Sequence, residues 1–411
     1  MSVMGADVMS PLAERYVRLV LAVGQHDPDF VDAYYGPQAW KPDPAEARQS
    51  TDDLERVADL LIQHLEATAV PDAPLERLRR DYLIAQTRAT RTRLSMLKSS
   101  RMTFDDESKK LYDAVAPTHD EAYFGDALKT LNAMLPGDGA LASRVEAFRQ
   151  RFVIPPDKLD AVFRAAVDAC RQQTVAHLTL PPGEQFTIEY VKGKPWSGYN
   201  WYQGNYRSLI QVNTDLPIFI DRALDLACHE GYPGHHVYNV LLEHRLVRGR
   251  GWQEFTVYPL FSPQSLIAEG TANFGIEVAY PASERVAFER AHLFPLAGLD
   301  SADAPKFYDV LAVLDRLAYA GNEAARRYLN GAINASQAAD YLVTYTLTSR
   351  QRAEQRVRFF DQYRSYVINY NLGKDLVRAY VERMGGTADK PDVRWKVFGE
   401  LLSSPRLPSG L

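Results

Sequence analysis

The chain has 411 residues, of which 46% are hydrophobic and 24% charged, a composition typical of a globular protein with a sizeable core. The formal net charge is −5 and no block is rich in basic residues, so the basic footprint of a nucleic-acid-binding protein is missing. Two cysteines, Cys170 and Cys228, are too few for a disulfide framework, and no apolar run is long enough to span a membrane.

The first thirty residues do not have the layout of a signal peptide. Their apolar stretch, residues 16–24, is short and is interrupted by Arg18. We therefore expect a cytoplasmic location in a reducing compartment, with neither a membrane nor a nucleic acid as partner. The sequence does not indicate an oligomeric state.

Most of the chain has apolar residues three and four positions apart, the periodicity of amphipathic helices. The segments with this periodicity are residues 11–24, 53–67, 75–97, 157–178, 305–332 and 336–364. Pro155-Pro156 is a start signal for the fourth segment, and Gly385-Gly386 is a stop signal after a helix around residues 375–384. The sequence therefore predicts a mainly α-helical fold.

One region departs from the helical periodicity. Residues 185–191 and 207–212 are rich in β-branched and aromatic side chains, which indicates strands of a small sheet or hairpin. Between them we predict a loop that packs over an active-site cleft; its aromatic residues are Trp196, Tyr199, Trp201, Tyr202 and Tyr206. We place a helical N-terminal portion at residues 1–180 and a catalytic portion at residues 181–411, within one continuous fold.

Four of the nine histidines fall within residues 227–244, and the first of them, His229, is followed directly by Glu230. Imidazole nitrogens suit zinc, and a glutamate after the first ligand histidine is placed to act as a general base. In the common HExxH motif the two histidines are four residues apart, one helical turn. Here His235 follows His229 by six residues and His236 by seven.

A regular helix cannot run between these histidines. Pro233 has no N–H, and its ring would clash with the carbonyl of His229 four residues earlier, while Gly234 loosens the backbone. We predict an interrupted hydrogen-bond ladder with a bulge that absorbs two residues and restores the HExxH relation for His235. In a regular helix His236 would lie on nearly the same side as His229, so it stays open as the alternative ligand.

The string HEGYPGHH, residues 229–236, resembles the HExxPGHH signature of a large bacterial family long labelled a domain of unknown function. That family is grouped with the gluzincin-type zinc metallopeptidases. In the family a helix beginning EGxA follows the motif, and here that string starts at Glu269. A tryptophan that the family has after the EG is Thr271 in this chain.

Other strings of the family occur in the same order along the chain. An NTxxP-like string after a strand matches residues 213–217, and a Tyr-x-x-Gly string matches residues 370–373. The resemblance covers residues 185–385 and extends more diffusely to DPDFVDAYYGP, residues 27–37. It implies a large helical gluzincin-like fold with a small sheet beside the active-site helix.

The resemblance also implies a single Zn²⁺ per chain, held by His229, His235 and Glu269. Glu230 would then be the general base, and Tyr370 would donate a hydrogen bond to the developing oxyanion. The expected reaction is hydrolysis of peptide bonds, with short peptides as substrates by analogy with related helical enzymes.

Further residues are candidates for supporting roles. His236 and Glu277 are candidates for orienting a ligand or contacting substrate, and Tyr366 is the rival of Tyr370. Arg358 is a candidate for binding a substrate carboxylate, although an arginine-rich helix more often presents a solvated face. We also expect the strand at residues 209–213 to bind substrate backbone by strand addition.

Two other functions stay open. The same metal site could hydrolyse a non-peptide amide or ester, or the chain could be a non-catalytic helical protein that binds a metal or a peptide. Glu230 favours an enzyme, because a pure metal-binding site does not need a carboxylate that is not itself a ligand.

Overall fold

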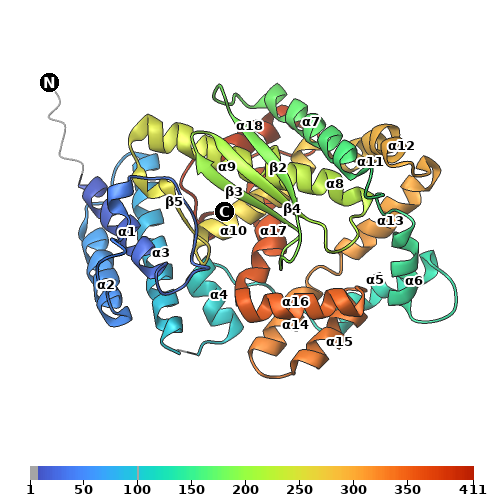
Figure 1. The fold of residues 1–411 in the computed structure, drawn as a ribbon, viewed down its shortest axis with the longest axis horizontal. Coiled ribbons are helices and arrows are strands. Elements are labelled where there is room, and N and C mark those ends of the chain that lie inside the picture. Colours follow the sequence, from blue (N-terminus) through green and yellow to red (C-terminus); the bar gives the residue numbers. More distant parts are fainter. Residues whose placement is uncertain (1–7, 100) are drawn as a thin grey trace.

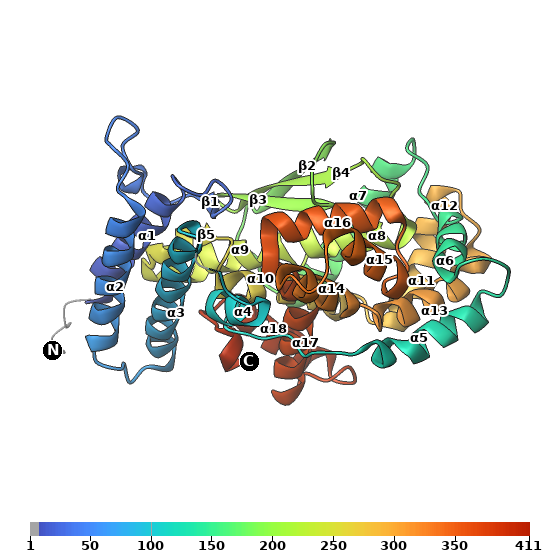
Figure 2. The same cartoon turned by 90° about the horizontal axis from the view of Figure 1, so that it is seen from below.

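The computed structural model describes residues 8–99 and 101–411. The chain folds mainly into α-helices, with one three-stranded sheet and one two-stranded sheet, which confirms the predicted fold class. Figures 1 and 2 show an elongated molecule with α1, α2 and α3 at one end and α5, α6, α12 and α13 at the other.

The helices of the first part are α1 (Met9–Val23), α2 (Thr51–Ala67), α3 (Pro74–Leu97), α4 (Phe104–Tyr112), α5 (Glu121–Met134), α6 (Leu141–Gln150) and α7 (Leu159–His177). The strands are β1 (Val31–Tyr34), β2 (Gln185–Val191), β3 (Gly198–Gly204), β4 (Arg207–Asn213) and β5 (Val257–Pro259). The helices after the sheet are α8 (Ile220–Leu226), α9 (His235–Leu242), α10 (Pro263–Ala279), α11 (Ala282–Phe288), α12 (Phe294–Ala297), α13 (Ala304–Asp315), α14 (Ala320–Leu329), α15 (Ala335–Tyr345), α16 (Arg350–Tyr363), α17 (Ile368–Arg383) and α18 (Pro391–Leu402).

Two of the predicted long helices are each two helices. Residues 305–332 form α13 and α14, and residues 336–364 form α15 and α16. Between the latter pair Leu347 has a φ of 53°, and the side chain of Ser349 accepts a hydrogen bond from the backbone N–H of Arg352. Ser349 therefore caps a new helix. Apolar periodicity did not show the break, because α15 and α16 each bury an apolar face and their sequence patterns run on from one to the other.

The three-stranded sheet has β4 at its centre, parallel to β2 and antiparallel to β3. The predicted loop between the two expected strands is therefore wrong in part, because Gly198–Gly204 is a strand. On this strand Asn200 and Tyr202 are buried while Trp201 is 46% exposed, which is the alternation of a half-buried strand. Its glycines and polar residues hid that pattern in the sequence.

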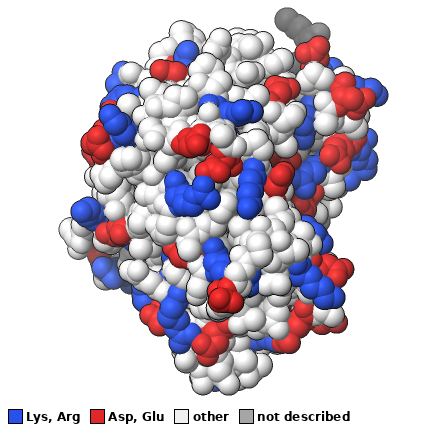
Figure 3. Space-filling view, turned by 90° about the vertical axis from the view of Figure 1, so that its right-hand side faces the viewer, with Lys and Arg blue, Asp and Glu red and all other residues white. Residues whose placement is uncertain are grey.

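Two features concern possible partners: the hydropathy of the helices and the distribution of charge on the surface. No helix in the described part of the chain combines the length and the apolar character needed to cross a bilayer. On the face shown in Figure 3, acidic and basic side chains are interspersed.

Helices α10 and α17 lie side by side near the middle of the molecule (Figures 1 and 2). A Cβ added to Gly270 would collide with the carbonyl oxygen of Gly373, and one added to Gly373 would lie 2.8 Å from the carbonyl oxygen of Leu266. The glycine at position 270 thus lets α10 approach α17. Its place beside Glu269 had suggested a different partner, the helix that carries the two histidines. The two backbones touch where α10 carries Glu269.

We predict that Gly270→Ala destabilises the protein by about 1–3 kcal/mol, because the added methyl group must push two helix backbones apart. Chemical denaturation measures this loss. The matched control is Gly125→Ala in α5, where an added Cβ meets nothing within 4 Å and the helix should gain about 0.5–1 kcal/mol. Equal stability changes in the two variants would contradict the close contact between the helices.

Candidate metal centre

The helix that carries the first histidine loses its regular hydrogen bonds just where the sequence predicts. α8 continues into the π-helical segment η2 (Ala227–Gly231), and α9 begins at His235. Between them the N–H of Tyr232 donates to the carbonyl of Ala227 at 3.1 Å, five residues back, and that of Gly234 donates to Cys228 at 2.9 Å, six residues back. The Tyr232–Pro233 peptide is cis. The predicted interruption is confirmed.

This break brings the two histidines together. The Nε2 atoms of His229 and His235 lie 3.2 Å apart, and Oε2 of Glu269 lies 3.3 Å from the first and 3.8 Å from the second. The three side chains are only 14%, 15% and 9% exposed. They form the one cluster of at least three potential metal ligands found among the described residues.

The spacing of these atoms fits zinc. A tetrahedral ion with bonds of about 2.0–2.2 Å separates neighbouring ligand atoms by about 3.3–3.6 Å. Oε1 of Glu269 accepts a hydrogen bond from the hydroxyl of Tyr366 at 2.8 Å, whereas its Oε2 is buried and lacks a well-aligned hydrogen bond. Two imidazoles and one carboxylate oxygen therefore point at a common position, and they are ligand types that zinc prefers.

The protonation states of His235 and Glu269 also suit cation binding. Burial opposes the charged form of His229, but Glu269 and Glu230 outweigh it and raise the pKa of His229, so a metal ion must displace its proton. Burial lowers the pKa of His235 to about 4, so its imidazole is neutral at pH 7. Burial opposes the charged form of Glu269, but hydrogen bonding with His229 and the electrostatic effect of the two adjacent imidazoles outweigh it and lower the carboxyl pKa. Neutral imidazole and ionised carboxylate are the forms that ligate metals.

His236 has a different environment from His235. Its side chain is fully buried, with Nδ1 2.8 Å from Oγ of Ser208 and Nε2 3.0 Å from Oε2 of Glu184. Glu184 also accepts hydrogen bonds from the hydroxyl of Tyr232 at 2.5 Å and from Arg171 at 2.7 Å. Both ring nitrogens of His236 are thus occupied in a network that ties the motif to β4 and to the segment before β2, so contact with substrate is excluded.

Glu230 lies beside the cluster, and its carboxylate forms no hydrogen bond or ion pair with any described residue. A Cβ added to Gly198 at the start of β3 would lie 2.6 Å from Oε1 of Glu230, so the strand passes close to this carboxylate. The backbone carbonyl of Glu230 accepts a hydrogen bond from Asn200 at 2.8 Å. Burial raises the pKa of Glu230 to about 7; His229 opposes this shift and Glu269 adds to it. The carboxyl group can therefore take up and release a proton near neutral pH.

The two candidate tyrosines have separate roles. Tyr366 donates its hydroxyl to Glu269 and so positions that side chain. The hydroxyl of Tyr370 bonds to no described residue, and its ring lines the same cavity as the histidines. Burial raises the pKa of Tyr370 well above its usual value, so the phenol keeps its proton and can donate a hydrogen bond.

Two of the predicted supporting residues lie elsewhere. Glu277 pairs with Arg378 at 2.5 Å and with Lys374 at 3.6 Å on α17, and orients neither histidine. Arg358 is exposed and does not line the cavity. Neither residue therefore has the supporting role for which it was a candidate, and Arg358 lies on the solvated face expected of an arginine-rich helix.

The cluster lies in a cavity of about 690 Å³. Residues that the sequence analysis did not single out contribute to its lining, among them Asp32 of β1, Asn200 of β3, Arg222 of α8 and Arg356 of α16. The resemblance of residues 27–37 to the family was the one signal that covered Asp32. The hydroxyl of Tyr199 donates to Asp32 at 3.0 Å, and burial raises the pKa of that carboxyl to about 7 although this hydrogen bond lowers it.

The sheet forms part of the cavity wall in an arrangement that was not predicted. Trp196, Tyr199 and Tyr202 line the cavity, as expected of aromatic residues beside a cleft, but the last two belong to a strand. β4 is flanked by β2 and β3, so strand addition at residues 209–213 is excluded. β3 is the edge strand that borders the cavity.

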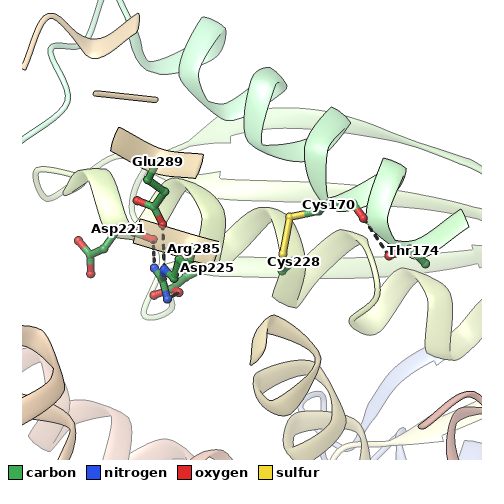
Figure 4. The surroundings of a disulfide bond; sticks show 7 residues. All are labelled: Cys170, Thr174, Asp221, Asp225, Cys228, Arg285 and Glu289. Atoms are coloured by element: carbon green, nitrogen blue, oxygen red, sulfur yellow. Dashed lines mark hydrogen bonds and ion pairs between the residues drawn. A yellow bond between two sulfur atoms is a disulfide. The ribbon is translucent and has the colours of Figure 1, made fainter. Parts of the chain in front are cut away.

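A disulfide joins Cys170 of α7 to Cys228, the residue before His229 (Figure 4). The sequence did not indicate this pairing, because two cysteines 58 residues apart are too few for a disulfide framework and we expected a reducing compartment. The fold brings α7 against η2, and both side chains are fully buried. Figure 4 also shows Arg285 between Asp225 and Glu289, with ion pairs of 2.8 Å to each. The motif helix is thus tied to α7 and α11.

No protein-family model matches the chain, and no curated protein matches it. Among solved structures, it is similar to a "putative lipoprotein" from Colwellia psychrerythraea, with a TM-score of 0.53 and 14% identity over 90% of this chain and 69% of that one. A "putative lipoprotein of unknown function" from Shewanella oneidensis matches with a TM-score of 0.40 and 13% identity, over 85% of this chain and 71% of that one. The first likeness shows a shared fold and nothing more. The TM-score of the second is too low to show a shared fold.

We predict that His235→Ala removes bound zinc, whereas His236→Ala retains most of it and instead loses about 2–4 kcal/mol of stability, because it leaves a cavity and removes the hydrogen-bond partner that Ser208 and Glu184 share. Elemental analysis after dialysis against trace zinc measures the metal, and thermal unfolding the stability. Retention of metal by the first variant and its loss from the second would exclude the proposed ligand set.

Proposed function

We propose that the protein is a zinc-dependent hydrolase of peptide bonds that acts on short peptides. The observation that carries this proposal is the convergence of His229, His235 and Glu269 beside the unbonded carboxylate of Glu230 at one cavity. The resemblance of the motif to the HExxPGHH family supports it, and a cavity of about 690 Å³ has the size of a site for a small ligand.

Each residue then has a task that its surroundings permit. Zinc at this position would supply the Lewis acidity that polarises a carbonyl group and makes water acidic. Glu230 takes a proton from the attacking water and delivers it to the leaving amine, which its raised pKa favours. Tyr370 donates a hydrogen bond to the carbonyl oxygen as negative charge develops on it.

The substrate backbone has an edge strand to pair with. β3 borders the cavity and has β4 on one side only within its sheet. An extended peptide along β3 would pass Gly198, where the strand comes closest to Glu230. Strand addition of this kind holds the backbone without regard to side chains.

The disulfide bears on the compartment that we propose for the protein. A cytoplasmic location stays a prediction from the sequence, whereas stable disulfides belong mainly to oxidising compartments. The Cys170–Cys228 bond therefore favours a compartment outside the reducing cytoplasm.

We predict that Glu230→Gln binds zinc normally and loses peptide hydrolysis by about three orders of magnitude, because it keeps the side-chain shape and removes the base. KM should change little, since the loss is in the transition state. Metal content and turnover of a peptide mixture are measured on one preparation. Full zinc occupancy with turnover near that of the wild type would contradict the general-base role. A wild-type protein that cleaves only esters or non-peptide amides would contradict the substrate class.

A second variant tests the position of the carboxylate without removing it. A Cβ in Gly198→Ala would lie 2.6 Å from Oε1 of Glu230 and 2.7 Å from a methyl group of Leu226, both of which are ends of side chains that can shift. We predict unchanged zinc content and nearly unchanged thermal stability, with kcat reduced roughly tenfold or more by the displaced base. The matched control, Gly125→Ala, should keep full turnover; wild-type turnover in Gly198→Ala would show that this contact does not position the base.

A further inference from the structure

One arginine of the cavity, Arg356, forms no ion pair and no hydrogen bond with any described residue. Arg356 lies on α16, partly buried, and lines the cavity together with the candidate metal ligands. In the described part of the chain, no carboxylate forms an ion pair with it and no residue accepts a hydrogen bond from it. Its guanidinium is surrounded by rings, with Cζ 4.6 Å from the ring centroid of Phe359, 5.7 Å from that of Phe360 and 5.6 Å from that of Tyr370.

The other arginines that line the cavity each have an acidic or carbonyl partner among the described residues. Arg222 pairs with Asp225 at 3.1 Å, and Arg149 lies 3.9 Å from Asp221. Arg352, one turn before Arg356 on α16, donates a hydrogen bond to the carbonyl of Pro217. Arg356 therefore differs from these neighbours in having neither an ion pair nor a hydrogen bond to any described residue.

Leaving a guanidinium group in this position is costly. A cation withdrawn from water loses hydration, and aromatic rings replace only part of it. Burial accordingly lowers the pKa of Arg356, although arginine starts so high that it stays charged. An anion that enters the cavity would offset this cost.

Arg356 also lies close to the reacting groups. Its guanidinium contacts the ring of Tyr370, the ring of Tyr370 lies 5.8 Å from that of Tyr366, and Tyr366 donates to Glu269. One residue of extended chain spans about 3.5 Å. An anion on Arg356 would thus be separated from a carbonyl group at the candidate metal centre by on the order of one to three peptide residues.

We propose that Arg356 binds the free C-terminal carboxylate of a peptide substrate, which makes the protein a carboxypeptidase that releases short C-terminal fragments. This inference rests on the proposed function. The fork of a guanidinium matches both oxygens of a carboxylate in two parallel hydrogen bonds. Hydrolysis adds one water across the C–N bond: the hydroxyl joins the carbonyl carbon, and the proton goes to the amine of the fragment held by Arg356.

The first experiment uses one peptide sequence in three forms: with both ends free, acetylated at the N-terminus, and amidated at the C-terminus. We expect the acetylated peptide to be cleaved like the free one and the amide to have a kcat/KM lower by roughly tenfold or more, the value of a charged hydrogen bond. Equal cleavage of acid and amide would overturn the proposal. So would loss of cleavage on acetylation, which would instead assign end recognition to Asp32 and the substrate amine.

The second experiment assigns the preference to a residue. Arg356→Gln should raise KM for the acid and cleave acid and amide alike, and Arg356→Lys should restore part of the discrimination. Arg358→Gln, on the exposed side of the same helix, is the matched control and should discriminate as the wild type does. Unchanged discrimination in a folded Arg356→Gln would overturn the assignment. Should both variants at position 356 fail to fold, the three peptides on the wild type still decide whether a free carboxylate is read.

Binding separates this inference from the proposed function. Calorimetry compares an acetylated dipeptide acid with its amide on zinc-loaded Glu230→Gln, with and without Arg356→Gln. A preference for the acid that disappears with Arg356 supports the carboxylate site even where no peptide is hydrolysed, an outcome that rejects the peptidase alone. Equal binding of acid and amide rejects the carboxylate site even where peptides are cleaved.

Discussion

Two imidazoles six residues apart can face one another only where the backbone between them leaves the regular helix. Pro233 and Gly234 provide this departure, and Gly234 leaves no room for a Cβ beside the carbonyl of His229. The same segment also positions the third residue of the cluster. A Cβ on Gly275 of α10 would lie 3.1 Å from the ring of Pro233, so the broken segment packs directly on the helix that carries Glu269.

Local chemistry in the sequence predicts the histidine pair and the break between them, whereas the choice of Glu269 came from the resemblance to the HExxPGHH family. Proline removes a donor wherever it stands, so the break between His229 and His235 follows without knowledge of the fold. The choice between Arg356 and Arg358 does not follow in this way. Residues two positions apart in a helix point about 200° away from each other. Only the packing of α16 against its neighbours therefore decides which of the two arginines faces the cavity. The position of Glu277 and the pairing of Cys170 with Cys228 depend on tertiary packing in the same way.

Behind the cluster lies a layer of residues that holds it in place. His236 bonds to Ser208 and Glu184, and Tyr366 holds the second oxygen of Glu269. Groups held before substrate arrives need little rearrangement during the reaction, which is the usual basis of electrostatic preorganisation. The groups that would move protons or meet substrate, by contrast, are Glu230, Tyr370 and Arg356, and the side-chain polar atoms of these three form no hydrogen bond or ion pair with a described residue.

The walls of the cavity come from both ends of the chain. Asp32 lies on β1, whose partner β5 follows it by more than two hundred residues, and Arg356 and Tyr370 come from the last quarter of the sequence. A ribosome therefore releases the segment with both histidines and Glu269 well before it releases the helix that lies across from them. During synthesis the nascent chain would have the candidate metal ligands but not all the walls of the cavity, so the proposed peptidase activity would arise only after residues 350–370 have also been made.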